Sequence, residues 1–100
     1  MVDLVVTKHA KRRIKARAGI NKRSSERLAE KAFMYGITHA ELSGSLCRYI
    51  DGVYLKYRKA NNIRIYNHQV FLFRGTVLIT MFPLPTKYYS TIENIKSKRN

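Results

Sequence analysis

The chain is poor in several residue types that mark particular protein classes. Its 100 residues include one cysteine, two prolines and no tryptophan. The lone Cys47 excludes an internal disulfide, and no pair of cysteines or histidines has the spacing of a zinc motif. Because Cys47 lies in a helical pattern, it is interpreted as a small buried side chain. We therefore expect neither a metal nor a cofactor.

Long apolar runs are also missing. No run approaches the roughly 18 residues that a membrane-spanning helix needs. The opening Met1-Val2-Asp3 lacks the basic and apolar regions of a signal peptide. These absences predict an intracellular, cytoplasmic protein with no membrane partner.

Carboxylates are scarce, with 6 Asp and Glu against 20 Lys and Arg, and the formal net charge is +14 at pH 7. The cations are concentrated in the first third and at the C-terminus, whereas residues 61–85 contain only Arg64 and Arg74. A charge of this size predicts a polyanionic partner. Nucleic acid is the first candidate and an anionic protein the second.

The N-terminal segment after Thr7 is the most basic part of the chain. It is predicted to form a helix that Thr7 caps and Gly19 ends. Cations near a helix N-terminus oppose the helix dipole and repel one another, so a ligand explains them better than local helix stability does. The cations of this segment, which contains no carboxylate, are Lys8, Lys11, Arg12, Arg13, Lys15 and Arg17.

Helical spacing divides this segment into two stripes. His9, Arg13 and Arg17 follow one another at intervals of four residues and form a polar stripe. Ala10, Ile14 and Ala18 form the apolar stripe beside it. One edge of the helix can therefore pack on a core while the next presents an imidazole between guanidinium groups.

The remaining chain changes from a helical to a strand period. A second helix is expected from Ser24 or Ser25 to about Tyr35, and a third from about 39 to 57 after the capping-box pattern of 38–41. Three short runs rich in β-formers then follow at hairpin spacing and end before the prolines at 83 and 85. These runs cover residues 63–66, 70–73 and 77–82, and a short helix is possible near residues 92–95.

These elements predict a single α+β domain over residues 1–100, with its core in 5–85 and a basic tail in 86–100. Two or three N-terminal helices would pack on a C-terminal antiparallel β-meander of about three strands. They would cover one sheet face, expected to carry Ile63, Ile65, Phe71 and Phe73. The other face would meet solvent or substrate.

Two short motifs resemble a known superfamily. The opening Lys8-His9-Ala10-Lys11-Arg12-Arg13 and the later Leu78-Ile79-Thr80-Met81-Phe82-Pro83 are similar to small phage and toxin-associated domains of the RelE, colicin D and barnase-like ribonucleases. The resemblance covers about residues 5–85, and the chain departs from the simplest pattern by a long insert around 42–59. It implies a metal-independent RNA-cleaving fold in which a histidine, a cation and a hydroxyl group converge.

Carried onto this chain, the matching catalytic positions are Lys8, His9, Arg13 and Thr80. Cleavage of RNA without a metal needs a base for the 2′-hydroxyl proton and cations for the charge on the phosphorane. His9 is the candidate acid or base, Arg13 would clamp phosphate oxygens, and Thr80 would bind phosphate or orient His9. His39 and His68 are interpreted as structural.

Further residues are candidates for nucleic-acid binding. Tyrosines after the meander are expected to be exposed and able to stack on unpaired bases. The alternative to a ribonuclease-like phage or toxin-type effector is a non-catalytic nucleic-acid-binding protein, or a phage-encoded inhibitor of a host nuclease or nucleoprotein complex. The expected partner is RNA or another nucleic acid, and the binding candidates are Lys11, Arg12, Lys15, Arg17, Arg64, Lys87 and Tyr88.

Overall fold

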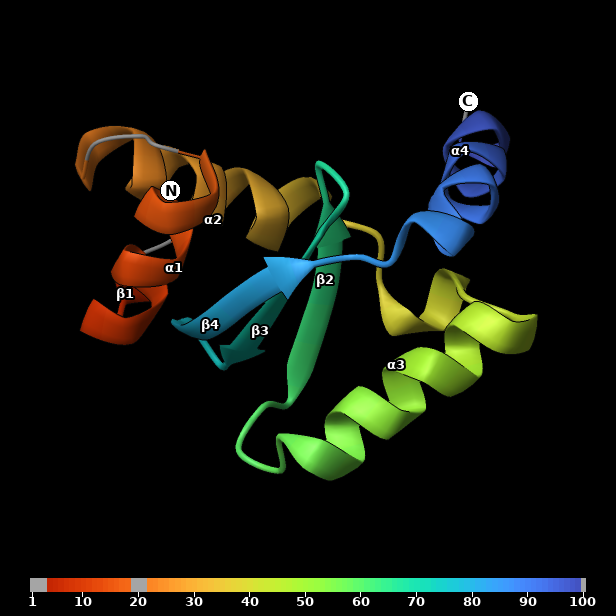
Figure 1. Ribbon diagram of the computed structural model, residues 1–100, viewed down its shortest axis with the longest axis horizontal. Helices are drawn as coiled ribbons and strands as arrows, with labels where there is room; N and C mark the ends of the chain where they lie inside the picture. The colour runs from red at the N-terminus through yellow and green to blue at the C-terminus, as the bar shows by residue number, and fades with distance from the viewer. Residues whose placement is uncertain (1–3, 19–21, 100) are drawn as a thin grey trace.

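The computed structural model describes residues 4–18 and 22–99, without the side chains of residues 17, 18 and 22–24. It is an α+β fold, as predicted, in which helices cover both faces of a mixed sheet (Figure 1). The elements in chain order are β1 (Val5–Val6), α1 (Lys8–Ala18), α2 (Lys22–Tyr35), η1 (His39–Glu41), α3 (Gly44–Lys56), β2 (Asn62–Tyr66), β3 (Gln69–Arg74), β4 (Val77–Pro83), η2 (Thr86–Tyr88) and α4 (Tyr89–Lys98).

The sheet has the strand order β1-β4-β3-β2. Strands β2, β3 and β4 form the predicted antiparallel meander. Asn67 and His68 connect β2 to β3 with φ values of 51° and 57°, the left-handed conformation that a two-residue hairpin turn requires. The prediction missed β1, which pairs in parallel with the start of β4. A strand of two residues is too short to produce a recognisable alternating pattern.

The pairing of β2 with β3 corrects the expected composition of the sheet faces. Ile63 pairs with Leu72 and Ile65 with Val70, so these four side chains share one face. Phe71 lies between Val70 and Leu72 in β3 and points to the opposite face, where it pairs with Arg64. The predicted grouping of Ile63 and Ile65 with Phe71 and Phe73 was therefore wrong, because strand register, and not hydrophobicity, decides which side chains share a face.

Helices α1 and α2 cover the face that carries Phe71 and Phe73. In α1, Ala10 and Ile14 are fully buried, which confirms two positions of the predicted apolar stripe; the side chain of Ala18 lies outside the described residues. Thr7 caps α1 as predicted: the Ala10 amide donates to its hydroxyl over 3.1 Å. The same hydroxyl donates to the Ile79 carbonyl over 3.0 Å and ties the start of α1 to β4. The expected stop at Gly19 lies outside the described residues.

Helices α3 and α4 cover the opposite face, which was expected to be open (Figure 1). This face buries Ile63, Ile65, Val70 and Leu72. The core continues past Pro85 into the expected basic tail, where Tyr88 and Ile92 are buried. Because both faces are covered, β3 is buried along its centre, as a strand between two helical layers must be.

The third predicted helix, 39–57, is divided in two. A 3₁₀ turn, η1, covers 39–41, and α3 begins only at Gly44. Leu42 and Ser43 between them have extended backbones. The extended segment places Leu42 in the core, at 9% exposure. Burial of Leu42 therefore outweighs the helical period that the sequence shows across this segment.

Candidate nucleic-acid interface

Helix α1 presents a basic surface beside its buried stripe. The side chains of Lys8, His9, Arg12 and Lys15 are exposed, and Lys11 is partly exposed. None of them has an ion pair within the described part of the chain. The side chain of Arg17 lies outside the described residues. Helix α1 therefore carries unneutralised charge, as the sequence predicted.

Arg13 connects this helix to a groove on α3. The groove has a volume of about 490 Å³. One wall is formed by Arg48, Gly52 and Lys56, which lie one turn apart on α3. Phe82 at the end of β4 contributes an aromatic ring. We call this hollow the α1–α3 groove; its lining residues are Arg13, Arg48, Tyr49, Gly52, Val53, Lys56, Tyr57 and Phe82.

The charges in the α1–α3 groove all have one sign. Arg13, Arg48 and Lys56 line it, and no carboxylate does among the described residues. Arg13 and Arg48 form no ion pair in the part of the chain that the structure describes. The Lys56 ammonium lies 5.6 Å from the centre of the Tyr57 ring. Guanidinium groups without a protein partner are suited to bind phosphate oxygens in a bidentate manner.

Three aromatic rings, those of Tyr49, Tyr57 and Phe82, line the same groove. Tyr57 stacks on Phe82 with ring centres 6.0 Å apart and an interplanar angle of 27°. Tyr49 packs against Tyr88, whose ring centre is 5.2 Å away. Burial raises the pKa of Tyr49, and neighbouring Tyr88 and Tyr57 raise it further. The Tyr49 phenol therefore stays protonated at neutral pH and can donate a hydrogen bond.

A second hollow extends the basic surface along the end of α3. It has a volume of about 270 Å³ and shares Lys56 and Tyr57 with the α1–α3 groove. Arg58 and Lys59 add two more cations, and again no described carboxylate lines it. The two hollows together form a cationic track with Tyr57 between them. A flexible polyanion could follow such a track from one phosphate to the next.

The structure does not join the predicted catalytic pair. Thr80 is 5% exposed, and the register of β4 places it opposite Leu72, on the sheet face that α3 and α4 cover. Among the described residues its hydroxyl has no hydrogen-bond partner, so the predicted bond between Thr80 and His9 is not formed. His9 is exposed on α1, one helical turn before Arg13. Of the predicted catalytic residues, Arg13 lines the α1–α3 groove.

Other predicted binding residues have structural contacts. Arg64 donates to the side chain of Asn62 over 3.0 Å and to the Gly36 carbonyl over 3.4 Å, which occupies part of its guanidinium. Tyr88 was expected to be exposed, and this was wrong: it is 7% exposed because α3 packs over it. Lys87 is exposed and lies 5.2 Å from the centre of the Tyr88 ring.

Sequence reasoning missed the α3 side of the groove. Arg48, Gly52 and Lys56 follow one another at intervals of four residues, the same spacing that revealed the His9–Arg13 stripe. This signal was available, but the expected helix also carried apolar residues on several faces. Only the packing of α3 on the sheet shows which of its stripes is free.

Comparison of the chain with protein-family models, curated proteins and solved structures gives no match. None of the described helices is both long enough and apolar enough to cross a membrane.

Proposed function

We propose that this protein binds single-stranded nucleic acid, with RNA as the expected ligand, in the α1–α3 groove and along the cationic track that continues from it. The observation that carries the proposal is the groove lining: three cations and three aromatic rings with no described carboxylate. Cations would bind the phosphates, and the rings would offer stacking surfaces to unpaired bases. The high net charge of +14 would speed association with any polyanion.

The proposal is limited to binding. A cleavage mechanism through His9 and Thr80 needs both side chains at one phosphate, whereas the Thr80 hydroxyl is enclosed in the protein. His9 remains a candidate for a phosphate or base contact, because helical geometry places it on the same stripe as Arg13. Incubation of RNA with the protein in EDTA, beside His9→Ala, tests the ribonuclease prediction in the same samples.

The decisive experiment compares two double variants that remove the same charge. Arg48→Ala with Lys56→Ala changes the groove, and Arg27→Ala with Lys31→Ala changes exposed positions of α2 outside it. Binding to a fluorescent single-stranded RNA is measured by anisotropy over a range of salt concentrations. We expect the groove variant to lower the slope of log affinity against log salt by about 0.7 for each phosphate that no longer meets a cation. The α2 variant should change it much less.

Equal loss of affinity in the two double variants would show that net charge alone attracts the RNA and would refute the groove. Tyr57→Leu separates stacking from charge, because leucine keeps apolar bulk without a flat ring. This variant should weaken binding by about 1–3 kcal/mol per stacked base while leaving the salt slope unchanged. The same measurements with single-stranded DNA and with duplex RNA of equal length show which form of nucleic acid the groove prefers.

A further inference from the structure

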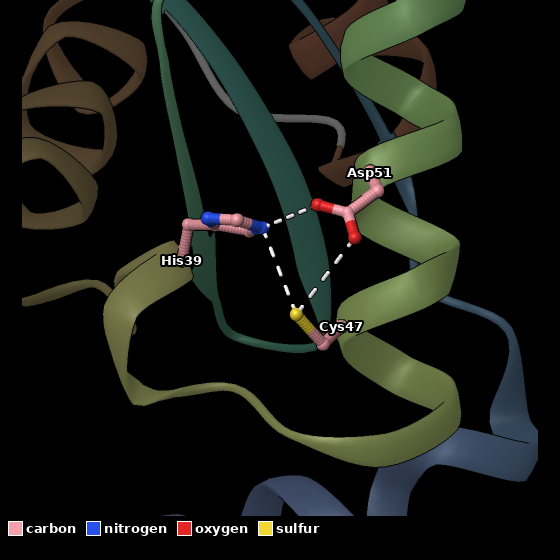
Figure 2. A group of neighbouring side chains, drawn as sticks. All are labelled: His39, Cys47 and Asp51. Atoms are coloured by element: carbon pink, nitrogen blue, oxygen red, sulfur yellow. Dashed lines mark hydrogen bonds and ion pairs between the residues drawn. The ribbon is translucent and has the colours of Figure 1, made fainter.

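Three side chains that can ligate a metal converge on the other flank of α3 (Figure 2). Cys47 and Asp51 are four residues apart and so project from the same flank of α3. His39 comes from η1 and points its imidazole toward them. One ligand atom of each residue lies within 4.8 Å of the other two. This cluster is separate from the groove lining, which uses Arg48, Gly52 and Lys56.

The hydrogen bonds within the cluster do not form a catalytic relay. His39 Nε2 lies 2.6 Å from Asp51 Oδ1 and 3.7 Å from Cys47 Sγ, so both partners face the same ring nitrogen. A histidine that activates a thiol uses one nitrogen for the thiol and the other for the carboxylate. Three ligand atoms that face one point instead form the arrangement that a metal ion requires.

The distances between the donors are close to those of a tetrahedral site. Ligand bonds of about 2.0–2.3 Å place neighbouring ligand atoms about 3.3–3.8 Å apart. Cys47 Sγ is 3.7 Å from His39 Nε2 and 4.0 Å from Asp51 Oδ2. The 2.6 Å contact between His39 Nε2 and Asp51 Oδ1 must lengthen, and the 4.0 Å separation of Cys47 Sγ and Asp51 Oδ2 must shorten slightly. The Asp51 side chain is 55% exposed and has room for that small rotation.

The turn that presents His39 is held in place on both sides. Before it, Ile37 exchanges two backbone hydrogen bonds with Ile65, of 2.8 and 3.1 Å. After it, Glu41 accepts from the Thr38 amide over 3.1 Å and from two Arg99 nitrogens over 2.6 and 2.8 Å. A ligand on a fixed turn loses little freedom when it binds an ion, which favours binding.

The His39 ring itself is also oriented. It forms a T-shaped contact with the Tyr54 ring, with ring centres 5.5 Å apart and an interplanar angle of 81°. The Tyr54 hydroxyl accepts a hydrogen bond from the Ile63 amide over 3.0 Å, which fixes that ring against β2. Tyr54 therefore keeps the imidazole directed at α3.

We propose that His39, Cys47 and Asp51 bind one divalent ion of the zinc class. A thiolate and an imidazole select such ions over Mg²⁺ and Ca²⁺, which prefer oxygen ligands. Thiolate and carboxylate together neutralise the two positive charges of the ion, and both ligands bind in their deprotonated forms. Three protein ligands leave a fourth position for water, and the partial exposure of His39 and Asp51 keeps that position open to solvent.

The site is tested with Co²⁺ as a spectroscopic probe on the full chain, freed of any affinity tag and stripped of metal. We expect one Co²⁺ per chain, with the visible absorption of tetrahedral cobalt and a thiolate-to-metal charge-transfer band in the near ultraviolet. Zn²⁺ should abolish both signals by displacement. Absence of the charge-transfer band at a hundredfold excess of Co²⁺ would overturn the proposal.

Variants locate the ion within the chain. Cys47→Ser should remove the charge-transfer band, and His39→Gln and Asp51→Asn should each weaken binding more than about 100-fold, since even residues outside a ligand set contribute 10–100-fold. His68→Asn is the matched control, because it removes a histidine away from the cluster and asparagine tolerates the positive φ at that position. Unchanged Co²⁺ affinity in Cys47→Ser, with a folded far-ultraviolet circular dichroism spectrum, would contradict the proposal.

Alkylation gives a second readout that does not depend on a folded variant. Cys47 is the single cysteine of the chain, so iodoacetamide reports on it alone. Zn²⁺ should slow its alkylation at least tenfold, and EDTA should restore the rate. Equal rates with and without Zn²⁺ would show that the thiol is not a ligand and would refute the site.

Discussion

The ion pair between Glu41 and Arg99 predicts a specific dependence of stability on pH. Arg99 donates to both oxygens of the Glu41 carboxylate, over 2.6 and 2.8 Å, and this contact joins η1 to the end of α4. The hydrogen bonds from Arg99 lower the pKa of Glu41 from 4.5 to about 2, with further help from the Thr38 amide. Replacement of Glu41 by glutamine keeps the shape of the side chain and an acceptor for the Thr38 amide, but it removes the negative charge.

The expected size of the effect follows from this shift. A fall in pKa from 4.5 to about 2 corresponds to at most about 3.5 kcal/mol of stability. The side chains of Arg99 and Glu41 are 37% and 29% exposed, so solvent screens their attraction. We therefore expect Glu41→Gln to lower the free energy of unfolding by about 1–2 kcal/mol at pH 7.

The sign of the pH dependence is also fixed. The folded state lowers the pKa of Glu41, so the stabilisation is fully present above about pH 5 and is lost as pH falls toward 2. Urea unfolding followed by far-ultraviolet circular dichroism at pH 7, 5 and 3 measures it. By pH 3 more than half of the difference between wild type and variant should be gone.

A surface carboxylate provides the control. Glu93 is 61% exposed and lies 3.8 Å from Lys96, so Glu93→Gln should change stability by less than about 0.5 kcal/mol. A difference between wild type and Glu41→Gln that stays constant from pH 5 to pH 3 would refute the role given to the Glu41 charge. Arg99 also donates to the Tyr35 and Gly36 carbonyls, over 2.8 and 3.2 Å, and no difference at pH 7 would show that these bonds alone hold it in place.

Three further substitutions test the packing, each measured as the free energy of unfolding in urea. Thr80→Val should stabilise the protein by about 1 kcal/mol, because it removes a buried hydroxyl that has no partner in the described part of the chain; a loss of stability would mean that this hydroxyl is satisfied. Gly52→Ala, with open space around its new Cβ on α3, should stabilise by about 0.5–1 kcal/mol. Gly36→Ala should destabilise by at least about 1–3 kcal/mol, since its Cβ would clash with the Ala32 carbonyl oxygen and lie 2.8 Å from the Arg64 Cβ; equal effects of the two alanines would contradict the close packing at Gly36.

Much of the local structure could be read from the sequence. Thr7 as a cap, the buried stripe of Ala10 and Ile14, and the Asn67-His68 turn all depend on neighbours within a few residues. Such signals survive in any tertiary context that buries one face of an element. The basic surface of α1 is of the same kind, because charge composition and helical spacing determine it.

The predicted catalytic site could not be read from the sequence, because it depends on which sheet face each side chain occupies. Thr80 and Phe71 belong to opposite sides of the sheet, and a shift of β4 by one residue in register would move Thr80 to the face of Phe71. The sequence contains no measure of that register, and so the predicted pairing of His9 with Thr80 lacked its geometric basis. The division of residues 39–57 into η1 and α3 likewise follows from the burial of Leu42.

The sequence by itself determined the α+β class, the order of helices before meander, and the excess of positive charge, because each is a sum or a short-range pattern. Only the tertiary structure decided that helices cover both sheet faces, that Arg13 joins Arg48 and Lys56 in one groove, and that His39 meets Cys47 and Asp51. Both groups of residues come together only because of the way α3 is rotated about its axis when it packs on the sheet. Burial of Leu46, Ile50 and Val53 sets that rotation and leaves one flank for the groove and the other for His39.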